Sequence, residues 1–143
     1  PDLTPETRRD NTRNMQLATL DVGGSKLHVA NHHAHWVMSP VGDEVSVEKM
    51  QLVAQKVRGL EGPVIVAGDL NVTAASPAMR VFDGLLTDLT ATHDIPDTLS
   101  ELGKVRNVPC DHILVNDQVK VNSFAVRDDL VSDHKTLVME FEL

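Results

Sequence analysis

Alternating runs of apolar and polar residues predict most of the strands in this chain. Residues 15–22 and 26–33 are two such runs around Gly23–Gly24, a pattern typical of a β-hairpin. Residues 63–67 are apolar throughout, which favours a central strand covered on both faces. From Leu137 onward every second residue is apolar, so one face of the last strand should be buried. Three runs late in the chain predict further strands: 111–116, 118–126 and 135–143.

Two segments have helical signals. Residues 46–58 place apolar side chains at helical spacing, with Ser46 as the expected N-cap. Ser76–Pro77 predicts the start of a short helix that ends by Gly84. The order of elements is therefore β-β-α-β-α-β-β-β, which predicts an α/β (α+β) fold with a mixed sheet and flanking helices. Residues 87–110 carry few periodic signals.

Composition narrows the class of protein. A length of 143 residues with 41% apolar residues fits one globular domain, and no apolar run is long enough to span a membrane. The chain begins with Pro1 and shows no signal-peptide pattern, so targeting is left open. A single cysteine, Cys110, excludes an internal disulfide and a multi-thiolate metal site. The net charge of −8 argues against a surface that binds nucleic acid by bulk electrostatics. A bound divalent cation can still supply positive charge locally.

Polar residues gather at the predicted ends of several strands. Asp69 and Asn71 follow the strand at 63–67, and His33 ends the strand at 26–33. If the last strands run antiparallel to the first, residues at their N-terminal ends meet these groups at one edge of the sheet. Open α/β sheets usually bind ligands at such an edge. The residues that begin the later strands are Asp111, Asp133 and His134.

Each of these residues also has an interpretation without catalysis. Asp69 and Asn71 are common turn formers, and Asp111 is able to cap the loop before it. The histidines at 32, 33 and 35 suit either a solvated strand end or the start of a zinc site, because His33 and His35 project to the same side of a strand. Taken singly, no position separates these alternatives.

The motifs taken together resemble one family. In order along the chain they are NHH (31–33), GDLN (68–71), CDHILV (110–115) and SDH (132–134). They are similar to the Asn-Thr-His, Gly-Asp-x-Asn, Ile-Asp-Tyr-Ile-like and Ser-Asp-His motifs of the endonuclease/exonuclease/phosphatase superfamily, which has the fold of deoxyribonuclease I. The resemblance covers residues 15–143. It departs from the family where His32 replaces Thr and His112 replaces Tyr, beside the site rather than in it.

The resemblance implies a hydrolase that cleaves phosphate esters by in-line attack of water, with Mg²⁺ or alternatively Mn²⁺ as cofactor. Asp69 would orient or deprotonate the water, with Asn71 as its partner. His134 would contact the phosphate or act as a base, and Asp111 would hold its ring by a hydrogen bond. The remaining positions that the resemblance carries over are His33 on the phosphate, Asp133 on the metal, and Asn31 and Ser132 as supports behind them.

The same resemblance implies that part of the family domain is not represented. The family's first half provides an Asn and a metal-binding Glu from early strands, and Glu6 lies in a polar loop or linker, 1–14, without a preceding strand. We therefore expect residues 1–143 to be the C-terminal half of a four-layer α/β sandwich, inactive alone. Its expected partners are a phosphate-ester substrate, nucleic acid included, and the missing N-terminal half or a homodimer mate.

Two other functions stay open at this point. One is a non-catalytic half-domain that binds a partner or itself through its sheet face, and the other is a zinc hydrolase built on the histidine cluster. The substrate is not predicted, because DNA, RNA, phospholipids and small nucleotides are all substrates within the family.

Overall fold

A mixed five-stranded sheet forms the centre of the protein. The computed structural model describes residues 13–104 and 107–143, so most of the predicted loop at 1–14, with Glu6, lies outside the described residues. The strands follow the order β1-β2-β3-β5-β4 across the sheet. Their bounds are β1 Met15–Val22, β2 Ser25–His32, β3 Val64–Asp69, β4 Thr87–Asp88 and β5 Asp111–Val115.

Strand directions bring the predicted site residues to one edge. β1 and β2 are antiparallel, β2 and β3 are parallel, and β5 runs antiparallel to β3 and β4. The C-terminal ends of β2 and β3 therefore lie beside the N-terminal end of β5. In this register Asp69 is directly opposite Asp111. The convergence expected from the order of the motifs is thus confirmed for these strands.

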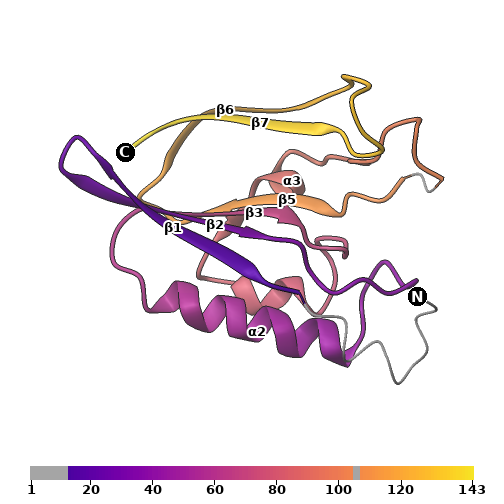
Figure 1. Ribbon diagram of the computed structural model, residues 1–143, viewed down its shortest axis with the longest axis horizontal. Helices are drawn as coiled ribbons and strands as arrows, with labels where there is room; N and C mark the ends of the chain where they lie inside the picture. Colours follow the sequence, from indigo (N-terminus) through magenta and orange to yellow (C-terminus); the bar gives the residue numbers. More distant parts are fainter. Residues whose placement is uncertain (1–12, 105–106) are drawn as a thin grey trace.

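One face of the sheet is covered by helix α2, Glu44–Arg58 (Figure 1). Met50, Val53 and Val57 pack from the helix onto apolar residues of the sheet such as Val66. The N-cap is Asp43 rather than the expected Ser46. The Asp43 carboxylate accepts from the Ser46 backbone N–H at 2.9 Å, while the Ser46 hydroxyl accepts from the Asp43 N–H at 3.2 Å. This reciprocal capping box moves the helix start two residues earlier than predicted.

The second face of the sheet carries a two-stranded antiparallel sheet, β6 Lys120–Arg127 and β7 Thr136–Glu142 (Figure 1). Phe124, Met139 and Phe141 are partly buried against Ile65 and Val115 of the central sheet. β5 pairs with β3 along one edge and with β4 at Leu114 and Val115 on the other, and the hairpin that follows forms a sheet of its own.

Short helical turns connect the remaining strands. The turn predicted after Ser76–Pro77 is a 3₁₀ helix, η1, at Met79–Phe82, and the buried Ser76 hydroxyl accepts from the Met79 N–H. Helix α3 spans Leu89–Thr92. Among the described residues, no helix has the length and apolarity needed to cross a membrane.

Candidate active site

Asp69 ends β3 at the point where β2 and β3 approach each other closely. Gly68 has φ +146°, and a Cβ atom at this position would overlap the backbone carbonyl of His32. Only glycine lets the two strands come this close. The Ala34 N–H then donates to the Asp69 carbonyl at 2.8 Å, and Nε2 of the exposed His33 lies 3.5 Å from Asp69 Oδ2. The chain turn thus brings His33 and Asp69 together, as their positions at strand ends predicted.

Asn71 completes the turn after Asp69. Its φ of 57° lies in the left-handed region that asparagine tolerates better than most residues. The Asn71 N–H donates to Asp69 Oδ1 at 2.9 Å, and its side-chain amide donates to the Ala34 carbonyl at 3.1 Å. Asp69 is therefore a turn former through Oδ1. Its other oxygen, Oδ2, lies toward the histidines, so the two interpretations of this residue are compatible.

His134 lies between two carboxylates. Its Nδ1 is 2.9 Å from Asp111 Oδ2 and 3.1 Å from Oδ1, so the expected pairing of these residues is confirmed. On the other side of the ring, Nε2 is 4.0 Å from Asp69 Oδ2. Because a carboxylate only accepts, the bond to Asp111 places a proton on Nδ1. The opposite edge of the imidazole then faces Asp69 at a separation longer than a hydrogen bond, so Nε2 and Asp69 Oδ2 do not bond each other directly.

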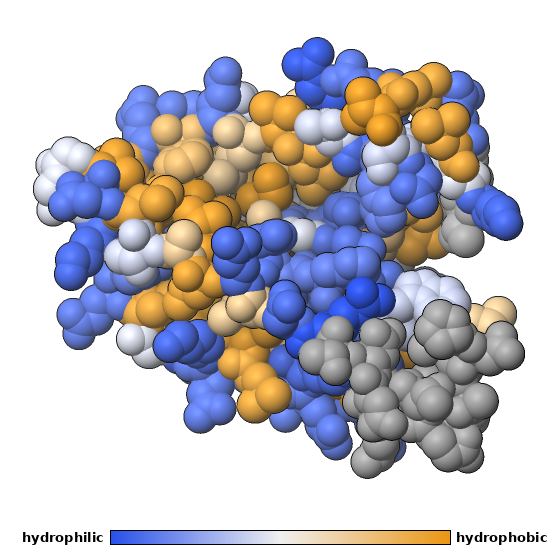
Figure 2. All heavy atoms as spheres, viewed as in Figure 1, coloured by the Kyte–Doolittle hydropathy of each residue, from blue (hydrophilic) through white to orange (hydrophobic). Residues whose placement is uncertain are grey.

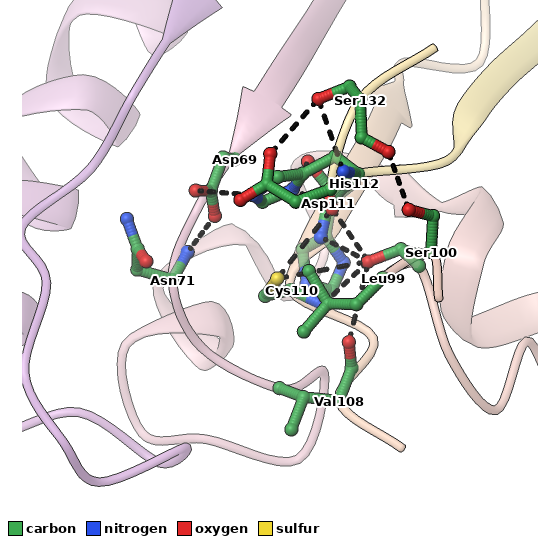
Figure 3. A network of polar contacts seen from close by, with 12 residues as sticks. Asp69, Asn71, Leu99, Ser100, Val108, Cys110, Asp111, His112 and Ser132 are labelled. Carbon is green, nitrogen blue, oxygen red and sulfur yellow. Dashed lines mark hydrogen bonds and ion pairs between the residues drawn. The ribbon is translucent and has the colours of Figure 1, made fainter. Parts of the chain in front are cut away.

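Asp111 is itself held by Thr98, which lies in the segment 87–110 that carries few periodic signals. The fully buried Thr98 donates its hydroxyl to Asp111 Oδ2 at 2.7 Å and accepts from the backbone N–H groups of Cys110 and Asp111. Figure 3 shows Asp69 and Asp111 at the centre of this network, with Asn71 on one side and Ser132 on another. Sequence reasoning missed Thr98, and no periodic signal marks it, since its partners come from the next strand.

Burial and neighbouring charges shift the pKa values of these groups. Burial raises the pKa of Asp69 above its ordinary value, and the charge of Asp111 raises it further. Burial acts to lower the pKa of His134, but its hydrogen bond to Asp111 and the charges of Asp111 and Asp69 outweigh this and raise it. The site therefore favours an imidazolium beside a carboxylate of increased proton affinity.

The remaining predicted residues lie around this centre. The Ser132 hydroxyl donates to Asp133 Oδ1 at 3.1 Å and accepts from the His134 N–H at 3.2 Å, so it shapes the turn before β7. The Asp133 side chain is exposed. Asn31 is exposed on β2, opposite Ala67, and its side chain takes no part in the described hydrogen bonds of the site. The supporting role of Asn31 stays a prediction.

A group of metal-type donors is present in this centre. Within residues 13–104 and 107–143, the one set of three whose ligand atoms lie within 4.8 Å of one another is Cys110, Asp111 and His134. The histidine cluster at 32, 33 and 35 forms no such set, and the His32 ring is bonded to the Asn14 carbonyl. The zinc alternative is therefore not supported.

That set does not fit Mg²⁺. Mg²⁺ prefers oxygen ligands in an octahedral arrangement. Burial, followed by the charge of Asp111, raises the pKa of the Cys110 thiol and keeps it neutral. Nδ1 of His134 is bonded to Asp111. A magnesium site at this edge therefore needs further oxygen ligands beyond this set.

The fold and the site define an α/β protein with a carboxylate–histidine centre at the edge of a mixed sheet. The chain belongs to the endonuclease/exonuclease/phosphatase family, whose model matches residues 3–134. Members of this family are hydrolases of phosphate esters, nucleic acids among them, and they generally depend on a divalent metal. The comparison with curated proteins found no match.

Solved structures share the fold. A mannosyl-6-phosphatase of Bacteroides thetaiotaomicron is 22% identical with a TM-score of 0.75, over 92% of this chain and 57% of that one. An endonuclease/exonuclease/phosphatase of Bacteroides vulgatus is 26% identical with a TM-score of 0.75, over 92% and 56%. TDP2 of D. rerio in complex with a single-strand DNA product is 17% identical with a TM-score of 0.69, over 92% and 62%. The chain thus spans little more than half the length of these proteins.

Proposed function

We propose that the complete protein is a metal-dependent phosphoesterase of nuclease or phosphatase type that hydrolyses its ester by in-line attack of water. The observation that carries the proposal is the placement of His134 between Asp111 and Asp69 at the sheet edge. Membership of the family supports the reaction class. Mg²⁺ is the proposed ion, because hard oxygen ligands suit it.

Each residue has a distinct part in this reaction. Asp69 Oδ2 accepts a hydrogen bond from the attacking water and takes its proton, while Oδ1 keeps the carboxylate oriented through the Asn71 N–H. His134 donates from Nε2 to a phosphate oxygen, and its charge is supported by Asp111. His33, exposed and beside Asp69, is positioned to donate to a second phosphate oxygen.

The cation would neutralise charge on the phosphate oxygens. Asp133 is the ligand that we assign to it within this chain, by its match to the family motif. A single exposed carboxylate makes a weak site, and Cys110, Asp111 and His134 do not replace the missing oxygen ligands. We therefore propose that the 143-residue chain is the C-terminal half of the domain and is inactive alone.

A non-catalytic half-domain that associates through its sheet is the second candidate. The observation that favours it is the exposure of Leu20 and Val22 on β1, beside the face that β6 and β7 cover only in part. It predicts association without hydrolysis, even when the upstream coding sequence is included.

Hydrolysis by two proteins tests the proposal: the 143-residue chain, and a longer protein that includes the upstream coding sequence. Both are assayed with bis-p-nitrophenyl phosphate, p-nitrophenyl phosphate and a single-stranded oligonucleotide, with Mg²⁺ and with EDTA. We expect the longer protein to hydrolyse at least one substrate, to lose activity in EDTA and to recover it with Mg²⁺.

Two variants make the test specific. In the longer protein, His134→Gln should abolish the activity, whereas His28→Gln, opposite the first residue of β3 and away from the site, should retain it. Activity that resists EDTA, or hydrolysis that survives His134→Gln, would contradict the proposed mechanism. Absence of hydrolysis in the longer protein would favour the half-domain.

A further inference from the structure

His112 is a buried histidine outside the site described above. It follows Asp111 on β5 and points to the opposite face of the strand, where its side chain is fully buried. Its Nδ1 lies 2.8 Å from Asp88 Oδ2, and its Nε2 lies 2.9 Å from the carbonyl oxygen of Val72. Both ring nitrogens therefore have a partner at hydrogen-bond distance.

The partners indicate the charge on this ring. A backbone carbonyl and a carboxylate accept hydrogen bonds and donate none, so satisfying both requires a proton on each nitrogen. Burial opposes that charge, but the hydrogen bond and charge of Asp88, with the Val72 carbonyl and the charge of Asp111, raise the pKa of His112. The ring is thus an imidazolium paired with Asp88, and it donates two charge-assisted hydrogen bonds.

The two hydrogen bonds of His112 connect the turn after Asp69 to Asp88, the residue that ends β4 and caps α3. Val72 is fully buried and ends the turn that begins at Asp69. Asp88 uses its second oxygen, Oδ1, to cap α3 by accepting from the Thr90 N–H at 3.0 Å. The Thr90 hydroxyl donates in turn to the Asp111 carbonyl at 3.0 Å. A continuous series of hydrogen bonds therefore runs from Asp111 through Thr90 and Asp88 to His112, and from His112 to Val72 in the turn.

These hydrogen bonds link the segments that carry Asp111 and Asp69, the two carboxylates that flank His134. Asp111 begins β5, and Asp69 ends β3 directly opposite it. The turn after Asp69 passes through Asn71 in the left-handed region, and the Leu70 N–H donates to the Cys110 carbonyl at 2.8 Å. A turn of this conformation needs fixed anchors at both ends. The β3–β5 pairing anchors the start of the turn. Further along, the Asn71 side-chain amide donates to the Ala34 carbonyl, and the Thr73 N–H donates to the Pro40 carbonyl at 2.8 Å. The bond from His112 to the Val72 carbonyl is the anchor that comes from β5.

We propose that His112, held by Asp88, is a positioning residue that fixes the turn 69–72 so that Asp69 faces His134. It touches neither substrate nor the reacting atoms. Its effect on turnover rests on the proposed function, whereas its effect on the turn does not. The simpler interpretation is a buried ion pair that only stabilises the fold.

Amide hydrogen exchange on the 143-residue chain separates these interpretations. The variants are His112→Phe, which removes both bonds, His112→Gln, which keeps one donor, and Asp88→Asn, which keeps the α3 cap acceptor but removes the charge. The matched control is His28→Phe. His28 is also a buried histidine with two partners, Thr19 and the Glu61 carbonyl, but it lies opposite Val64 at the start of β3, away from the turn 69–72.

We expect His112→Phe to speed exchange at the amides of Leu70, Asn71 and Thr73 by about tenfold or more relative to the amides of β1, β2 and α2, since losing one anchor costs about one hydrogen bond locally. His112→Gln should give a smaller increase at the same amides, and His28→Phe none there. If His112→Phe does not fold, His112→Gln and Asp88→Asn provide the comparison. Unchanged exchange at the turn, or an equal increase throughout the chain, would overturn the proposal.

Steady-state kinetics of a catalytically active protein provide a second test of the positioning role. His112→Gln should lower kcat while KM changes by less than about twofold, because a displaced Asp69 loses its position relative to the attacking water rather than its contact with substrate. A normal kcat together with a loosened turn would show that the turn tolerates this displacement, and it would overturn the positioning role. Absence of activity in the parent protein would instead count against the proposed function and leave the exchange result standing.

Discussion

Asp69 shows how one side chain serves structure and chemistry with separate atoms. Its Oδ1 accepts the Asn71 N–H that closes the turn, and its Oδ2 lies near His33 and His134. A turn former needs only one of these oxygens. The orientation of the second toward two imidazoles has no role in the turn, which is why we assign it to the reaction.

The change Asp69→Asn separates these two functions. Asparagine is nearly isosteric and keeps an oxygen for the Asn71 N–H, so the turn should persist. In the active protein we expect kcat to fall about 10²–10⁴-fold, with a much smaller change in KM, as for loss of a general base. Steady-state kinetics with Mg²⁺ measure both constants.

Asp21→Asn is the matched control, because Asp21 accepts from the Gly24 N–H in the β1–β2 turn and lies far along the hairpin from the site. Its kinetics should equal those of the parent. Near-normal turnover in Asp69→Asn would show that Asp69 is a turn former only.

The pair of Asp111 and His134 predicts a pH dependence. Asp111 helps to raise the folded-state pKa of His134 above its ordinary 6.5. A group with a raised folded pKa contributes stability that is fully present below its unfolded pKa and is lost as pH rises through the folded value. In metal-free protein, this contribution should therefore fade above pH 6.5, and Asp111→Asn should remove it.

Histidine ring NMR measures the midpoint directly. The His134 ring should titrate above 6.5 in the parent chain and lower in Asp111→Asn. A midpoint for His134 that does not move in Asp111→Asn would contradict the electrostatic coupling between these two residues.

At the scale of elements, the site depends on how closely β2 and β3 approach. Gly68 allows the approach, and the strand pairing then places His33 beside Asp69. Strand ends are usually less ordered than strand centres. Here the Ala34 N–H and the Asn71 amide both bond across the gap and hold the two ends together.

Gly68→Ala should destabilise the protein far more than a glycine substitution in an open turn. Its φ of +146° is nearly restricted to glycine, which costs about 1–3 kcal/mol on its own, and overlap with the His32 carbonyl adds to this. Gly84→Ala is the control, since Gly84 has φ +69° but no atom within 4 Å of the added methyl group. We expect a cost of about 1–2 kcal/mol there. Urea unfolding of both variants measures the difference, and equal losses would show that β2 and β3 separate easily.

At the scale of the whole molecule, one face of the central sheet is incompletely covered. Leu20 is paired with Leu27 on the face that β6 and β7 cover, yet Leu20 is 47% exposed and Val22 is 46% exposed. Figure 2 shows apolar side chains gathered where β1 and β2 lie and continuing toward the second sheet. Exposed apolar surfaces of this kind commonly mark interfaces.

We expect the isolated 143-residue chain to be catalytically silent and to associate, either with a second copy or with the rest of its domain. Light scattering and a phosphodiesterase assay on one sample test both parts. Leu20→Gln should weaken association, whereas Leu52→Gln, on the solvent side of α2, should not. A stable monomer with metal-dependent turnover would contradict the assignment of this chain to half of the domain.

Much of the fold follows from local patterns. Alternation along the hairpin and the apolar run at 63–67 predicted β1, β2 and β3, because burial of one or both strand faces leaves a direct trace in the sequence. The Gly-Asp-x-Asn and Ser-Asp-His motifs predicted where Asp69 and His134 lie. Even the helix whose start was misassigned, α2, was located by its apolar spacing.

Only the tertiary structure determined which polar groups meet. Thr98 and Asp88 lie in a segment without periodicity, and each acts through a partner on β5, Asp111 or His112. Periodicity reports how far a residue is buried but not which distant atom completes its hydrogen bonds. The separation of β6 and β7 into their own sheet is also a matter of long-range pairing, which places β4 beside β5. The sequence alone thus determined the elements and the residues of the candidate centre, and long-range pairing determined how that centre is held.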